Sequence, residues 1–167
     1  MDWRRILTHL LLPGWWARYC FRRRDVLAIE AAISVAEDRH RGELRFVVEG
    51  PLSLWSLLRG QSPRQRAVEL FSRFRIWDTE ENSGILIYVQ LADRRVEILA
   101  DRGIAAKVPQ AEWQALCRTM EQAFRQRQYR EGALMAIQGA SALLTAHFPA
   151  DDTDLNANEL PDRPVLL

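Results

Sequence analysis

Four oxygen-bearing side chains stand where a folded chain could bring them together. Glu80 and Asn82 come just before one apolar run, Asp101 follows the next run, and Glu43 precedes a third run far upstream. Carboxylate and amide oxygens are the ligands that hard cations such as Ca²⁺ and Mg²⁺ prefer. These residues are therefore a candidate metal site. Neighbouring residues are further candidates: Asp78, Glu81 and Arg102.

Such a site allows three interpretations. A bound metal could neutralise phosphate charge and activate water while Arg102 holds the phosphate, which would make the protein a phosphatase. The site could instead bind a cation without catalysis. The third interpretation needs no ligand, because acidic residues before a strand usually form a solvated turn, and Asn82-Ser83-Gly84 is typical turn sequence.

The sequence contains no other motif that predicts catalysis. It lacks a phosphate-binding glycine loop and a nucleophile-elbow serine motif. Its three histidines, His9, His40 and His147, lie far apart in the chain. Its two cysteines, Cys20 and Cys117, form no CxxC pair and predict no disulfide framework. Whether the protein is an enzyme stays open, with weak phosphatase activity as the catalytic candidate.

The elements that must position the acidic residues are strands. Two β-rich runs, 84–90 and 95–100, flank a short polar turn and predict a β-hairpin. In an antiparallel hairpin the start of the first strand lies beside the end of the second, which brings Asn82 and Asp101 together. A strand over 43–49 that pairs parallel to the first hairpin strand, after a right-handed crossover, would bring Glu43 to the same edge.

Helical patterns fill the rest of the chain. Helices are predicted over 25–39 with Asp25 as N-cap, after Ser62, from Pro109 to about 126, and over 131–147. Ser62-Pro63-Arg64-Gln65 is a capping-box sequence. The order predicts an α/β fold, a small three-layer sandwich. Its central mixed sheet contains one parallel crossover and a β-hairpin, with helices on both faces.

The composition divides the chain of 167 residues into three parts. Residues 25–148 form one α/β domain, residues 1–24 a basic aromatic arm, and residues 149–167 an acidic tail that we expect to be disordered. The net charge of +1 argues against nucleic-acid binding, which usually requires a strongly basic domain.

The arm has two interpretations. Leu7, Leu10 and Leu11 share a helical face, and tryptophans lie among arginines. The arm could pack against the domain or an unknown protein partner, or it could contact an anionic membrane surface. The apolar run over 6–12 is far below the roughly 20 residues that span a bilayer, and it does not resemble a signal peptide. We expect a cytoplasmic protein, with peripheral contact at the inner membrane as the alternative.

Several short segments together resemble the TPM-domain family, which includes thylakoid-lumen photosystem II repair proteins and an animal receptor modulator. The resemblance covers roughly residues 25–148. The segments are Gly42-Glu43-Leu44-Arg45, the run over 79–88, the run over 93–98, Asp101-Arg102-Gly103-Ile104, and Trp113.

The resemblance implies an α/β sandwich, divalent-metal binding with calcium included, and acid phosphatase activity in some members. Many members carry a signal peptide and a transmembrane segment, which this sequence does not show. The turn Asp101-Arg102-Gly103 is closer to a bacterial subgroup than the glycine-aromatic-glycine turn frequent in the family. We therefore expect a divalent-cation-binding interaction module linked to membrane-protein assembly or maintenance. The alternative is a metal-dependent acid phosphatase-like hydrolase.

Overall fold

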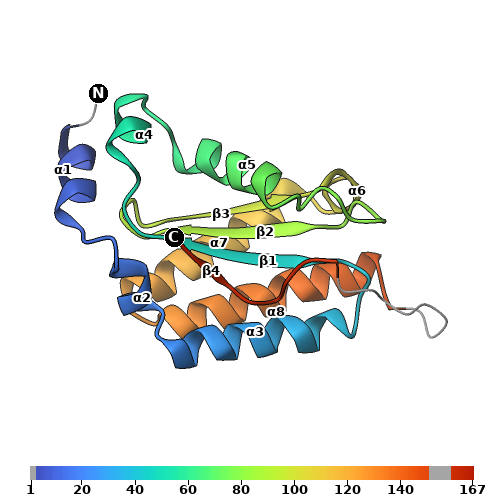
Figure 1. Ribbon diagram of the computed structural model, residues 1–167. Coiled ribbons are helices and arrows are strands. Elements are labelled where there is room, and N and C mark those ends of the chain that lie inside the picture. The colour runs from blue at the N-terminus through green and yellow to red at the C-terminus, as the bar shows by residue number, and fades with distance from the viewer. Residues whose placement is uncertain (1–2, 151–158) are drawn as a thin grey trace.

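A four-stranded mixed sheet in the order β3-β2-β1-β4 forms the centre of the molecule (Figure 1). β1 (Leu44–Glu49) pairs parallel to β2 (Ile85–Gln90), and β2 pairs antiparallel to β3 (Arg95–Ala100). β4 (Val165–Leu166) pairs parallel to the other edge of β1. The structure is a computed structural model that describes residues 3–150 and 159–167. The predicted hairpin and the predicted parallel pairing of β1 with β2 are both confirmed.

Helices cover both faces of this sheet, which confirms the predicted α/β sandwich (Figure 1). α5 packs on one face, and α3, α7 and α8 pack on the other. The helices of the described residues are α1 (Trp3–Leu11), α2 (Trp16–Cys20), α3 (Arg23–Glu37), α4 (Leu54–Leu58), α5 (Pro63–Arg73), α6 (Arg102–Ala105), α7 (Gln110–Arg125) and α8 (Tyr129–His147).

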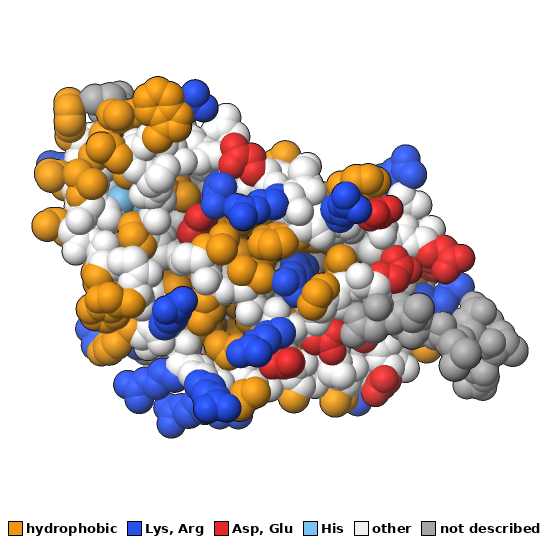
Figure 2. Space-filling view, in the orientation of Figure 1, with side chains coloured by type: hydrophobic (Ala, Val, Ile, Leu, Met, Phe, Trp, Pro, Cys, Tyr) orange, Lys and Arg blue, Asp and Glu red, His pale blue; other side chains and the backbone are white. Residues whose placement is uncertain are grey.

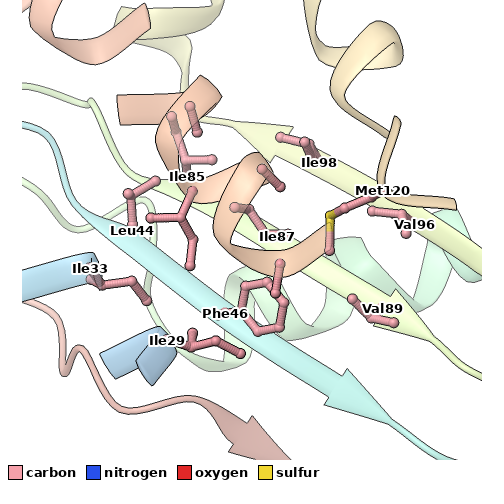
Figure 3. Close-up of a cluster of buried hydrophobic side chains, with 14 of the residues drawn as sticks. Ile29, Ile33, Leu44, Phe46, Ile85, Ile87, Val89, Val96, Ile98 and Met120 are labelled. Carbon is pink, nitrogen blue, oxygen red and sulfur yellow. The ribbon is translucent and has the colours of Figure 1, made fainter. Parts of the chain in front are cut away.

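The sheet separates two apolar cores because successive side chains of a strand point to opposite faces. Every residue of β1 and β2 is buried, as expected for strands covered on both faces. Figure 3 shows the larger core, where side chains of α3, α7 and the strands β1, β2 and β3 meet. Its labelled members are Ile29, Ile33, Leu44, Phe46, Ile85, Ile87, Val89, Val96, Ile98 and Met120.

Local capping explains where three helices begin. Ser62 and Gln65 form the predicted capping box, since the Gln65 amide donates to Ser62 Oγ at 3.2 Å and the Ser62 amide donates to Gln65 Oε1 at 2.8 Å. The prediction of Asp25 as an N-cap is wrong. Arg22 is the N-cap of α3, and Asp25 lies in the first turn, where its carboxylate accepts the Arg22 amide at 3.0 Å. Residues 102–105 form the short helix α6, with Asp101 as its N-cap.

The expectation of disorder over 149–167 is wrong for residues 159–167. Leu160 is buried beside α5, and β4 pairs with β1. The Arg45 guanidinium donates to the backbone carbonyls of Pro161 and Arg163. Residues 151–158 lie outside the described residues. The acidic composition misled the prediction because a few apolar side chains and a free strand edge are enough to hold the segment.

The N-terminal arm packs against the domain. Arg5 donates two hydrogen bonds to the Asp93 carboxylate at 2.8 and 2.7 Å, and His9 Nε2 lies 3.1 Å from the same carboxylate. His9 Nδ1 accepts the Leu52 amide at 2.9 Å, and Ile6 is buried beside Leu52. These contacts fix α1 beside α4 and the β2–β3 turn. None of the helices in the described part of the chain is both long and apolar enough to cross a membrane.

Candidate functional site

The open end of the hairpin brings Asn82 and Asp101 together, as the strand pattern predicts. The Asp101 amide donates to the Gly84 carbonyl at 2.9 Å, and the Gly103 amide donates to the Asn82 carbonyl at 2.9 Å. Asn82 has a positive φ of 52°, a left-handed conformation that asparagine tolerates better than most residues. A side chain at Gly84 would collide with the Ile76 carbonyl, so glycine is required there.

Arginine side chains contact two of the polar side chains at this end of the hairpin, Asn82 and Glu81. Arg102 Nε donates to Asn82 Oδ1 at 2.7 Å, and Arg41 Nη1 lies 2.5 Å from Glu81 Oε1. Asp101 Oδ1 accepts the Arg102 amide at 2.7 Å as the N-cap of α6. The other oxygen, Asp101 Oδ2, is buried and has no hydrogen-bond partner among the described residues. A buried carboxylate oxygen without a donor is costly, so a ligand there would be stabilising.

Two of the other predicted ligands, Glu43 and Glu80, contact the C-terminal segment. Glu43 is only 2% exposed, and its Oε2 accepts the Leu160 amide at 3.0 Å. Glu80 has an exposed side chain, and its backbone amide donates to the Glu159 carboxylate at 3.2 and 3.3 Å. Asp78 is exposed as well. The described residues contain no group of three or more histidine, cysteine or acidic side chains arranged to hold a metal ion.

A buried pair of glutamates lies under the C-terminal segment, and the sequence interpretation identified only one of them. Glu37 Oε1 accepts the Leu44 amide at 2.9 Å. Burial, followed by the charge of Glu43, raises the pKa of Glu37 to about 9. Burial likewise raises the pKa of Glu43 to about 7. Glu37 could have been found from its spacing, because it stands four residues after Ile33 on the buried face of its helix.

Exposed apolar side chains gather on the two neighbouring helices α1 and α4. Figure 2 shows them as orange groups at the upper left, where α1 lies. We call this set the α1–α4 surface. Its members are between 47% and 82% exposed: Trp3, Leu7, Leu10, Leu11, Leu54, Trp55 and Leu58. Single exposed apolar residues are ordinary, but a contiguous group usually marks an interaction surface.

Comparison with known proteins identifies the family. A family model described as the TPM domain matches residues 20–143. The chain belongs to the TPM-domain family. The TPM match begins in α2 and ends in α8, so α1 and the C-terminal segment over 159–167 lie outside it.

Two solved structures resemble this TPM-domain protein. The BA42 protein from the psychrophilic bacterium Bizionia argentinensis has 26% sequence identity and a TM-score of 0.74, covering 86% of this chain and 93% of its own. The N-terminal domain of the cg2496 protein from Corynebacterium glutamicum has 16% identity and a TM-score of 0.52. The match covers 79% of this chain and 77% of that domain, and it shows similarity of fold only. A search of proteins with curated functions gave no significant match.

Proposed function

We propose that this TPM-domain protein is a non-catalytic interaction module that docks on a membrane surface and serves membrane-protein assembly or maintenance. The observation that carries the proposal is the α1–α4 surface, whose large apolar side chains stay exposed although the helices that bear them are fixed to the fold. A helix of nine residues is too short to cross a bilayer but can lie in its interface.

The residues around the surface favour lipid as its occupant. Trp3 and Trp55 are 64% and 63% exposed, and tryptophan is enriched where membranes meet water. Arg59 lies over the Trp55 ring at 4.6 Å from the ring centroid, and the exposed Arg4 belongs to α1. Cations beside an apolar surface attract anionic headgroups.

Co-sedimentation with vesicles of phosphatidylcholine and phosphatidylglycerol tests this proposal. We expect the full chain to sediment with the vesicles and the Leu10→Gln/Leu11→Gln variant to lose most of that binding. The matched control is Leu27→Gln/Val35→Gln on α3, which also removes two exposed apolar side chains, 52% and 56% exposed. Equal binding of both variants and the wild type would refute membrane docking through α1.

A second candidate function is divalent-cation binding at the hairpin end, and the buried Asp101 Oδ2 favours it. Asn82 Oδ1 is the second oxygen at this end, and Arg102 would have to release it for a cation to bind there. The Glu43 carboxylate accepts the Leu160 amide and the Glu80 amide donates to Glu159, so we build the candidate site from Asp101 and Asn82.

A thermal melt with and without Ca²⁺ tests the cation proposal. A bound cation should raise the melting temperature of the wild type, and Asp101→Asn should abolish the shift while keeping the helix cap. Glu80→Gln is the control and should keep the shift. No shift in the wild type would refute cation binding. Equal turnover of a phosphate ester by wild type and Asp101→Asn would exclude a hydrolase at this site.

A further inference from the structure

A large cleft opens at the end of the sheet opposite Asp101. Its volume is about 890 Å³, and it is bounded by the ends of β2 and α7, the β2–β3 turn, and the start of α3 and α8. The carboxyl ends of parallel strands are a common place for ligands in α/β sheets, and a cleft of this volume can hold a small organic molecule. We call it the basic cleft.

The basic cleft concentrates the positive charge of the molecule. Seven arginines and three carboxylates line it, a net charge of +4, whereas the whole chain has a net charge of +1. The Glu121 carboxylate forms ion pairs with Arg95 at 3.8 Å and with Arg125 at 3.9 Å. Arg24 lies 3.5 Å from the Asp25 carboxylate. Four lining arginines have no carboxylate within 4.0 Å among the described residues: Arg22, Arg94, Arg127 and Arg130. Figure 2 shows basic groups gathered at the lower left, around the start of α3.

Two of these four arginines occupy strained backbone positions. Arg94, in the β2–β3 turn, has a φ of 54°, and Arg127, just after α7, has a φ of 62°. The amides of Arg127 and Gln128 donate to the carbonyls of Phe124 and Ala123, the C-terminal helix motif in which glycine is the usual residue. At these two positions arginine strains the backbone, whereas glycine would not. Such strain suggests that the arginine side chain itself has a function.

Arg94 and Arg127 line the same cleft as a group of aromatic side chains, the aromatic wall. The charges of both act on Tyr129, where they oppose burial and a Cys20 hydrogen bond, which raise the pKa of that phenol to about 12. The Tyr129 ring lies 5.4 Å from the Phe124 ring, and the Trp16 and Tyr19 rings stack at 5.2 Å in the same lining. The cleft therefore combines guanidinium groups with flat apolar faces.

We propose that the basic cleft binds a phosphomonoester that carries a planar or apolar group, with the phosphate held between Arg94 and Arg127 and the remainder against the aromatic wall. Guanidinium groups bind phosphate oxygens through paired hydrogen bonds, and aromatic faces stack on planar groups. A free phosphate ester and a lipid headgroup share this chemistry. The proposal does not rest on membrane docking by α1 or on a cation at Asp101.

Calorimetric titration of the full chain with adenosine monophosphate, and with adenosine as the control, tests the proposal for a soluble ligand. Binding should require the phosphate. Arg94→Gly and Arg127→Gly should each weaken it on the order of tenfold, the loss of one charge-assisted contact. Glycine suits the backbone at both positions, so these variants should melt no lower than the wild type.

Arg75→Gly is a matched control for Arg127→Gly. Arg75 also has a positive φ, 52°, and follows α5 in the same motif, with the Arg75 and Ile76 amides donating to the Ser72 and Phe71 carbonyls. It does not line the cleft. Arg75→Gly should therefore leave ligand binding unchanged.

Vesicles of phosphatidylcholine with phosphatidic acid test the lipid source, and vesicles with phosphatidylserine control for charge without a phosphomonoester. If Arg94→Gly and Arg127→Gly lose only the preference for phosphatidic acid, the ligand is a lipid headgroup. If they lose adenosine monophosphate binding, it is a soluble ester. The proposal is overturned if the wild type binds neither probe through its phosphate, or if both variants bind like Arg75→Gly. Leu10→Gln/Leu11→Gln should keep binding of the nucleotide, which separates this site from membrane docking.

Discussion

Replacing Glu43 with glutamine should change how the stability of the protein depends on pH. Glu43 is buried under the C-terminal segment, near Glu37, Glu159 and Asp162, and burial is the main cause of its raised pKa. Glutamine keeps an oxygen that can accept the Leu160 amide but carries no charge. The substitution therefore removes the titration and keeps the contact.

The expected size follows from the pKa of Glu43. The pKa of Glu43 rises from 4.5 in the unfolded chain to about 7 in the fold, and at about 1.4 kcal/mol per pH unit this shift corresponds to about 3 to 4 kcal/mol. The folded protein retains the proton more strongly than the unfolded chain. This contribution to stability is therefore complete below a pH of about 4.5 and is lost as the pH rises through about 7.

Urea unfolding of wild type and Glu43→Gln over a series of pH values measures the effect. The two proteins should have similar free energies of unfolding near pH 4.5, and the variant should be the more stable one by up to about 3 to 4 kcal/mol above pH 8. Glu112→Gln, at an exposed position on α7, is the control and should follow the wild type. A difference between wild type and Glu43→Gln that stays constant with pH would refute the reasoning.

Three further perturbations test other parts of the fold. Gly84→Ala places a methyl group against the Ile76 carbonyl and should destabilise by about 3 kcal/mol, whereas Gly14→Ala, which meets nothing within 4 Å, should not. Asp93→Asn should release α1 and speed proteolysis of the arm. Although burial opposes its ionisation, hydrogen bonds from α1 lower the pKa of Asp93 to about 2, so acid should release α1 as the pH falls from about 4 through 2. Leu160→Ala should cost about 2 to 3 kcal/mol and speed hydrogen exchange in β4 without altering the hairpin.

The elements that depend on local sequence were predictable. The hairpin is encoded by two β-rich runs with a polar turn, and α5 is encoded by its capping box. Asn82 and Asp101 could be placed together because hairpin pairing is a local rule. The parallel pairing of β1 with β2 followed from the handedness of crossovers.

The environment of Glu43 could not be predicted in the same way. Its carboxylate contacts the Leu160 amide, 117 residues away, in a segment whose acidic composition indicates disorder. The basic cleft was missed for a related reason. Its arginines come from the N-terminal arm, from the β2–β3 turn and the start of β3, and from the stretch where α7 ends and α8 begins. Only the assembled fold brings Arg94 and Arg127 to the same cleft.

The pairing of β4 with β1 has a consequence for how the protein folds. Contacts between residues distant in sequence form slowly, because a long loop must close before they contribute. The hairpin and the β1–β2 pair need shorter loops, so we expect them to form first. Until β4 arrives, the outer edge of β1 offers unpaired amides and carbonyls to any other extended chain. Aggregation during refolding should therefore be most severe in this intermediate, and a peptide of residues 159–167 added in excess should suppress it.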